Sequence, residues 1–195
     1  MTRRTGLRAD AARNREAILE AARTVFVAHG PEAGMDDIAA KAGVAVGTLY
    51  RHFPTKQDLI QTIAEDLGAA IAATLDAAVL RIADGHSTAL DEILALIRRV
   101  VVEMGHERLL RAALSEVAPD PFQAMREQAK ESVERMIAMA HQARAVRPDL
   151  TVDDVILLLN SSPGVETAKS DRERWLELVE GALSGQTRRL SAKTP

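Results

Sequence analysis

The stretch Gly34–Lys56, GMDDIAAKAGVAVGTLYRHFPTK, predicts a short helix, a tight turn and a second short helix. Its apolar face is supplied by Ile38, Ala42, Val44 and Leu49. Gly43 stands where the chain must turn, because a residue without Cβ takes a positive φ at no steric cost. The small side chain of Ala39, four residues earlier, lets the two helices approach closely. This pattern is typical of a DNA-binding helix-turn-helix, whose second helix enters the major groove.

The motif lies within a longer segment, about residues 10–60, that resembles the N-terminal signature of the TetR family of transcriptional regulators. The resemblance is carried by AILEAA and VFVAHG in the preceding helix, by GTLYRHF in the second motif helix and by the Thr-Lys pair that follows. It implies an all-α fold of about nine helices. In such a fold an N-terminal three-helix DNA-binding domain is joined to a helical domain that binds an effector and forms a dimer.

The segment departs from the family pattern at one place. Family members often carry Thr or Ser just before the Asp-Asp-Ile segment, as helix cap and phosphate contact, whereas this chain has Gly34 and Met35. Glycine is an acceptable N-cap, only a few tenths of a kcal/mol worse than serine. The hydroxyl contact is absent, but the backbone N–H groups and the positive dipole end of the helix remain available to a phosphate.

The composition is ordinary for a globular protein, with 195 residues, 47% hydrophobic and 27% charged. Because there is no cysteine, disulfides, thiolate metal sites and cysteine nucleophiles are excluded. The first residues are basic and polar, and no run approaches ~18 uncharged apolar residues, so neither a signal peptide nor a membrane span is expected. These features predict a cytoplasmic protein.

The charges are unevenly distributed along the chain. Residues 1–56 carry nine Lys/Arg and six Asp/Glu, whereas residues 57–195 carry sixteen and twenty-two. The net charge of −3 therefore divides into +3 for the N-terminal part and −6 for the rest. Such a distribution suits a protein that meets DNA with one end only.

Strand signals are nearly absent, and the hydrophobic periodicity predicts an all-α chain. We expect a flexible basic arm at 1–9, a DNA-binding domain at 10–56 with its motif at about 34–53, a helical effector-binding and dimerisation domain at 57–185, and a flexible tail at 186–195. The predicted helices are Asp10–His29, Met35–Ala42, Val46–His52, a long helix from Leu59 to about Ile82, and later helices that carry Leu90–Met104, Leu109–Leu114, Phe122–Ala140, Val155–Leu159 and Trp175–Leu183. Helix caps are expected at Thr55 with Asp58, at Ser87, at Thr151, and at Ser170 with Glu173.

The second motif helix spans only about 10 Å at 1.5 Å per residue. Leu49 is expected to point inward, which leaves the other side chains for the groove and its walls. Thr48 suits a base edge or a thymine methyl, whereas Arg51 suits a guanine or a phosphate. The resemblance implies phosphate contacts from Tyr50 and Lys56. The predicted DNA-binding residues are Gly34, Met35, Ala45, Val46, Gly47, Thr48, Tyr50, Arg51, His52, Thr55 and Lys56, with Arg3, Arg4 and Arg8 in the arm.

Plainer roles stay open for several of these residues. Tyr50 and His52 are also suited to packing at a helix surface, and Arg51 to a solvated charge. The basic arm either tracks the DNA backbone or enters the minor groove, or it is a disordered tail.

A recognition helix of two turns reads only a few base pairs, so two copies on a pseudo-palindromic operator are expected. The run Val155–Leu159 is apolar on every side of its helix, and one side of it needs a partner. Together with the apolar face of the last helix it would form a four-helix interface in a two-fold homodimer. The alternative is a helix buried wholly within one subunit. The predicted dimer residues are Val155, Ile156, Leu158, Leu159, Trp175, Leu176, Val179 and Leu183.

The resemblance implies a small-molecule pocket enclosed by the helices from residue 57 to about 145. An effector would act by binding more tightly to the form of the protein that does not bind DNA. The chain has few aromatic residues after residue 60, which favours a mostly apolar effector over a caged cation. The predicted lining is Leu67, Ile71, Ile97, Met104, Met136 and Met139, each also suited to the plain core.

Other functions are weakly supported. The five histidines are dispersed without metal-binding spacing, and the chain has neither a glycine-rich phosphate loop nor a Gly-x-Ser-x-Gly motif, so an enzyme, a metal site or a cofactor is not expected. The alternative to a DNA-binding regulator is a helical dimeric interaction protein without sequence-specific DNA binding. The residues do not distinguish a repressor from an activator, although repression is the commoner behaviour in the family.

Overall fold

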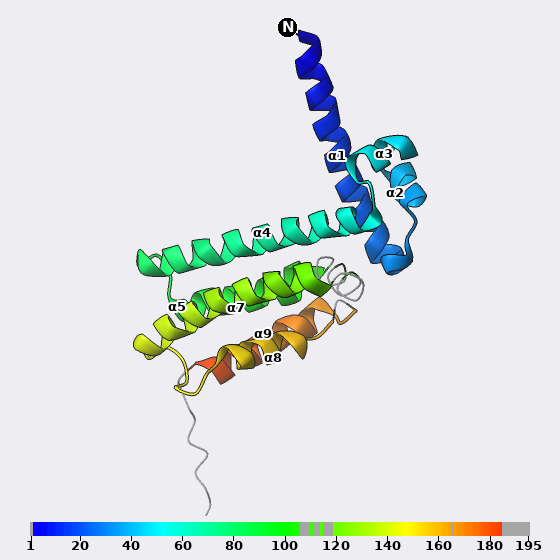
Figure 1. The fold of residues 1–195 in the computed structure, drawn as a ribbon. Coiled ribbons are helices and arrows are strands. Elements are labelled where there is room, and N and C mark those ends of the chain that lie inside the picture. The colour runs from blue at the N-terminus through cyan, green and yellow to red at the C-terminus, as the bar shows by residue number, and fades with distance from the viewer. Residues whose placement is uncertain (1, 106–109, 111–113, 115–118, 165, 185–195) are drawn as a thin grey trace, which may run out of the picture. The chain divides into compact units, whose positions relative to one another are not determined.

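The structure, a computed structural model, describes residues 2–105, 110, 114, 119–164 and 166–184. These residues form α-helices and no strand, apart from an isolated bridge between Val146 and Ser184. The all-α prediction is therefore confirmed. The helices are α1 (Thr2–His29), α2 (Met35–Ala42), α3 (Val46–His52), α4 (Lys56–Ala83), α5 (Ala89–Arg98), α7 (Pro119–Gln142), α8 (Val152–Asn160) and α9 (Lys169–Leu183), with a 3-10 turn at Gly30–Glu32 and a π-helical turn at Arg99–Glu103 (Figure 1).

The chain divides into two compact units. The first consists of residues 1–70 and 106–126, and the second of residues 71–105 and 127–195. Helix α4 begins in the first unit and continues into the second. In the first unit, α2 and α3 pack against α1 (Figure 1). In the second unit, α5, α7, α8, α9 and the later part of α4 share one hydrophobic core.

Several helices begin at the predicted caps. At the start of α4, the Thr55 N–H donates to Asp58 Oδ2 at 2.9 Å and the Asp58 N–H donates to Thr55 Oγ1 at 3.1 Å, which is the expected capping box. The same reciprocal pair joins Thr151 and Asp154 at the start of α8. Each box satisfies N–H groups that the first turn of a helix cannot bond internally.

Two cap predictions are wrong by one or two residues. Helix α5 is capped by Thr88, because Ser87 instead bonds the carboxylate of Glu92. Helix α9 begins after Ala168, with no side-chain cap. Ser170 is already the second residue of α9, so it cannot be the N-cap that the predicted box with Glu173 requires.

Two helix bounds also differ from the prediction. Helix α1 begins at Thr2 rather than near Asp10, because no proline interrupts this segment and its Arg, Leu and Ala residues favour a helix. The single helix expected up to Met104 is α5 followed by the π-helical turn. Of the short helix expected around Leu109–Leu114, Leu110 and Leu114 are helical and buried, and the rest lies outside the described residues, as does the tail at 186–195.

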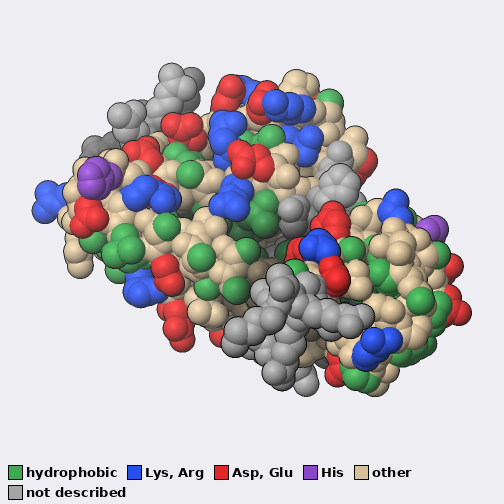
Figure 2. All heavy atoms as spheres, turned by 90° about the horizontal axis from the view of Figure 1, so that it is seen from above, with side chains coloured by type: hydrophobic (Ala, Val, Ile, Leu, Met, Phe, Trp, Pro, Cys, Tyr) green, Lys and Arg blue, Asp and Glu red, His purple; other side chains and the backbone are tan. Residues whose placement is uncertain are grey.

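The described helices include none long and apolar enough to cross a membrane. Over the face drawn in Figure 2, Lys and Arg side chains lie among Asp and Glu side chains, with hydrophobic side chains between them. A surface with both signs interspersed is usual where a protein faces water.

Candidate functional site

The helix-turn-helix has the predicted bounds, with α2 and α3 joined by three residues. Gly43 takes a left-handed conformation with φ of 68°. The Val44 N–H donates to the Ala39 carbonyl at 3.1 Å, and the Gly43 N–H donates to the Ala40 carbonyl at 3.2 Å, so the last carbonyls of α2 are satisfied by the turn itself. A Cβ at Gly43 would meet no atom within 4 Å. Backbone conformation, rather than space, is therefore what selects glycine here.

One buried leucine anchors the recognition helix α3. Leu49 is fully buried, and it is the only buried residue of α3. Fully buried side chains of α1 and α2, Phe26 and Ile38, belong to the core of the same unit, and Phe53 directly after α3 is also buried. The Arg23 guanidinium of α1 donates to Asp66 Oδ2 of α4 at 2.9 Å within this unit. Helix α3 thus packs against α1 and α2 through its one buried side chain.

The remaining side chains of α3 face outward. Val46 is 39% exposed and Tyr50 is 46% exposed. Ala45, Gly47 and Arg51 are also exposed, whereas Thr48 and His52 are half-buried. Neither the Tyr50 nor the Arg51 side chain forms a hydrogen bond or ion pair with a residue that the structure describes, and a Cβ at Gly47 would meet no atom within 4 Å. The side chains of Val46, Tyr50 and Arg51 are therefore exposed on α3, and Thr48 and His52 are only partly accessible.

The start of α2 offers backbone groups rather than side chains. Gly34 is the extended N-cap without a side-chain bond, and the Met35 side chain is buried. Contact between this end of α2 and a phosphate would therefore use backbone N–H groups. Asp36 and Asp37 in the first turn stabilise the helix through its dipole, but their negative charges repel an approaching phosphate.

The other predicted DNA contacts are less available. Thr55 is committed to the capping box of α4. The Lys56 ammonium lies 5.9 Å from the centre of the Phe26 ring, in cation–π geometry, and is half-buried. The side chains of Arg3, Arg4 and Arg8 lie outside the described part of the structure, so the DNA-contacting arm stays a prediction.

Replacing Gly43 with valine is expected to destabilise the motif by about 1–3 kcal/mol, because a β-branched residue is strained at a positive φ. The free energy of unfolding by urea measures the loss. The matched control is Gly47→Ala, in the middle of α3 with open space around it. That change should raise stability by up to about 1 kcal/mol through helix propensity. Equal stability of the two variants would contradict the role given to Gly43.

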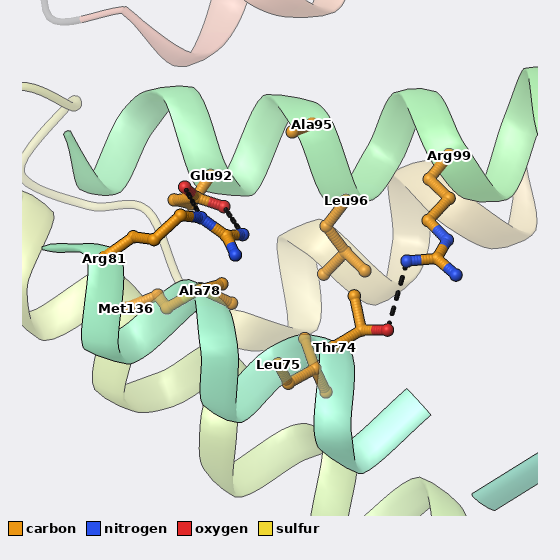
Figure 3. Close-up of a pocket in the computed structure, with 9 residues that line it drawn as sticks. All are labelled: Thr74, Leu75, Ala78, Arg81, Glu92, Ala95, Leu96, Arg99 and Met136. Atoms are coloured by element: carbon orange, nitrogen blue, oxygen red, sulfur yellow. Dashed lines mark hydrogen bonds and ion pairs between the residues drawn. The ribbon is translucent and has the colours of Figure 1, made fainter. Parts of the chain in front are cut away.

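The second unit contains a small cavity of about 110 Å³. Figure 3 shows Arg81 and Glu92 at one end of it, Arg99 and Thr74 at the other, and Leu96 between them. Its lining comes from α4, α5, the first residue of the π-helical turn, and α7: Thr74, Leu75, Ala78, Arg81, Glu92, Ala95, Leu96, Arg99 and Met136.

Of the six predicted effector residues, only Met136 lines this cavity. Ile97 lies in the hydrophobic core of the second unit, and Ile71 and Met139 pack against that core. Leu67 belongs to the first unit and Met104 follows the π-helical turn. The described residues contain no group of three or more His, Asp or Glu side chains that could hold a metal ion.

The ion pair at one end of the cavity is bidentate. Arg81 Nε donates to Glu92 Oε1 at 2.8 Å and Nη2 donates to Oε2 at 2.7 Å. The Glu92 side chain is only 8% exposed. Hydrogen bonds from Arg81 hold the pKa of Glu92 below its ordinary value of 4.5, although burial raises it. The same bonds raise the pKa of Arg81.

The lowered pKa of Glu92 predicts a pH-dependent contribution to stability. A carboxyl with a lower pKa in the folded state stabilises the fold above its unfolded-state pKa, and that contribution disappears as pH falls through the folded-state pKa. Glu92→Gln should therefore lower the free energy of unfolding by about 1–3 kcal/mol between pH 5 and 7. The difference in free energy of unfolding between the wild type and Glu92→Gln should shrink below pH 4.5. Denaturant titrations at several pH values measure it, with exposed Glu134→Gln as control; a difference independent of pH would contradict the assignment.

The predicted dimer residues separate into two groups. Val155, Leu176, Val179 and Leu183 are buried in the core of their own subunit. Ile156 is 38% exposed, and Leu158, Leu159 and Trp175 are half-buried. Two leucines that the prediction omitted are far more exposed, Leu157 at 65% and Leu178 at 58%. Helices α8 and α9 thus leave three large apolar side chains exposed, Ile156, Leu157 and Leu178.

Both the N-terminal and the C-terminal part of the chain match families of known proteins. Residues 18–63 match the bacterial regulatory proteins of the tetR family, and residues 88–185 match the C-terminal domain of SbtR-like transcriptional regulators. The chain belongs to the TetR family. It is accordingly a DNA-binding transcriptional regulator and not an enzyme.

Relatives of this TetR-family regulator include proteins of known structure. The TetR transcription regulatory protein from Mycobacterium vanbaalenii is 32% identical with a TM-score of 0.65, over 91% of this chain and 99% of that chain. The repressor LfrR of Mycolicibacterium smegmatis is 39% identical over 46% of this chain and 42% of its own length. The regulator TtgW of Pseudomonas putida is 45% identical over 32% of this chain and 46% of its own length. The matches to these two curated relatives thus span less than half of their length.

Sequence reasoning missed the two exposed leucines and most of the cavity of this TetR-family regulator. Leu157 lies in the apolar run that was singled out, but the run gives no sign of which residue faces outward. Arg81 and Glu92 are 11 residues apart on different helices, so no local pattern pairs them. Their juxtaposition depends on how α4 and α5 pack.

Proposed function

We propose that this TetR-family regulator is a repressor that binds a pseudo-palindromic operator as a homodimer and is released by a small-molecule effector. The observation that supports it most is the exposed outer face of α3. That face carries Tyr50 and Arg51 without partners among the described residues, while Leu49 anchors the helix from behind. Base readout needs such side chains to be free for the groove.

Within this proposal the outward residues have different roles. Tyr50 and Lys56 contact phosphates, Thr48 approaches a base edge, and Arg51 binds a guanine or a phosphate. Exposed Gly47 lets the backbone of α3 come close to DNA. The protein acts in the cytoplasm, where bacterial DNA is accessible.

The homodimer uses the surface formed by Ile156, Leu157 and Leu178. Leu157 and Leu178 are more than half exposed on helices that share one core, and a two-fold contact would bury these apolar side chains. Half-buried Trp175 on α9 would extend the contact. Dimerisation supplies the second recognition helix that a palindromic operator requires.

A reporter assay in a bacterial host tests repression. The DNA upstream of the gene that encodes the chain is placed before a reporter, and the chain is supplied from a second plasmid. Reporter output should fall with the wild type and recover at least severalfold with Arg51→Ala, because each lost DNA contact costs about 1–3 kcal/mol. The control is Arg98→Ala, which removes the same charge from an exposed position on α5. Output that rises with the wild type would indicate an activator.

A further inference from the structure

The guanidinium of Arg99 is a cation without an acidic partner among the described residues. Its Nη1 donates to the neutral hydroxyl of Thr74 at 3.1 Å, and no ion pair is formed within that part of the chain. A guanidinium has five N–H donors in a planar fork. Most of this fork is therefore available to a ligand in the cavity that Arg99 lines.

The charges around the cavity leave an excess of one positive charge. Glu92 is neutralised by its bidentate pair with Arg81 at the opposite end, so it does not compensate Arg99 (Figure 3). A carboxylate near Arg99 would gain charge-assisted hydrogen bonds in the bidentate geometry that suits a guanidinium. A cation would be repelled by Arg99 and find the only lining carboxylate occupied.

The walls between the two polar ends are hydrocarbon. Leu75, Ala78 and Met136 are buried there, and Leu96 is half-buried. The volume of about 110 Å³ is smaller than the ~150 Å³ cavity that holds benzene in a well-studied case. It therefore suits a carboxylate with a short apolar group better than a bare inorganic anion or a large ligand.

The position of Arg99 in the chain adds an independent observation. Arg99 begins the π-helical turn Arg99–Glu103, and such turns are frequent at functional sites. Within this turn the Val101 carbonyl accepts a hydrogen bond from Arg172 Nη1 of α9 at 3.2 Å. The Nε of Arg172 is buried and has no hydrogen-bond partner among the residues that the structure describes. The segment that holds Arg99 is thus tied to one of the two helices that carry the exposed leucines.

We propose that the effector of this regulator is a small monocarboxylate, with its apolar group against Leu75, Leu96 and Met136 and its carboxylate on Arg99. The inference rests on the proposed function, because it names the chemical class of the effector. Arg99 recognises the anionic group, and the hydrocarbon walls limit the size of the rest. Binding displaces Arg99 toward the ligand and alters the π-helical turn beside α9.

Isothermal titration calorimetry on the full chain tests the site directly. The probes are butyrate and hexanoate, with the matching neutral amides and inorganic phosphate as comparisons. We expect at least one carboxylate to bind, and Arg99→Gln to weaken it about ten- to hundredfold, as loss of a charge-assisted hydrogen bond implies. Arg99→Lys should keep part of the affinity. Arg98→Gln, the same change at the adjacent exposed arginine outside the cavity, should leave it unchanged.

The second measurement is release from DNA, followed by fluorescence anisotropy with the bound carboxylate. Release in the wild type and in Arg98→Gln, but not in Arg99→Gln, supports the proposal. It is overturned if no carboxylate binds, if the amides or phosphate bind equally well, if Arg99→Gln binds like the wild type, or if the bound carboxylate leaves DNA affinity unchanged. Failure of the ligand-free wild type to bind DNA would count against the proposed function alone, because the calorimetry still decides whether Arg99 holds a carboxylate.

Discussion

Leu49→Ala is expected to lower the free energy of unfolding of the N-terminal unit by about 2–5 kcal/mol, the usual range for truncating a fully buried leucine. The reason is that Leu49 is the only buried residue of α3, and a helix of 7 residues has no stability of its own. Without this anchor, Tyr50 and Arg51 lose their fixed orientation. Specific DNA binding should therefore disappear together with stability.

Denaturant titration of the purified variant measures the loss, and circular dichroism reports whether helix content falls with it. The matched control is Val46→Ala on the same helix, where the side chain is 39% exposed. Its effect on stability should stay within about 0.5 kcal/mol. If the two variants were equally stable, α3 would not be held by the core of its unit, and the account of the recognition helix would be wrong.

The double variant Leu157→Asp with Leu178→Asp is expected to convert a dimer into a monomer. Both side chains are more than half exposed, so the added charges cost little in the isolated subunit but would be buried unpaired in a two-fold contact. Affinity for a full palindromic operator should fall by about 10²–10⁴, the usual gain from linking two binding modules. Binding to a single half-site should change little.

Sedimentation or light scattering at micromolar concentration gives the mass. Leu80→Asp provides the control, because Leu80 is also a strongly exposed leucine, 62% exposed, but lies on α4, which carries none of the proposed interface residues. Its mass and operator affinity should match the wild type. A wild type that is already monomeric, or a double variant that remains dimeric, would rule out this interface.

The sequence was most informative where structure is decided locally. The bounds of α2 and α3 follow from the periodicity around Leu49 and from the need for a left-handed residue at Gly43, and both are confirmed. The capping box at Thr55 is also confirmed, and it was predictable because its partner is only three residues away. These features depend on neighbours in the chain.

What depends on packing could not be predicted. The run Val155–Leu159 is apolar all round, so its sequence does not show that Val155 enters the core while Leu157 stays 65% exposed. The cavity was expected to be aliphatic, yet it has Arg81, Glu92 and Arg99 at its ends, brought together by α4 and α5. The capping role of Ser170 is wrong because α9 begins one residue before it, at Lys169.

The most direct test of the account is a titration of the purified chain, at stated salt, onto labelled DNA from the region upstream of its own gene, with a scrambled duplex as competitor. The account predicts salt-sensitive binding that survives the competitor and is lost in Arg51→Ala or Tyr50→Ala. Binding to this DNA no tighter than to the scramble would call for selection from random sequences. No sequence-preferring binding in that selection, even at low salt, would contradict the central claim that α3 reads DNA.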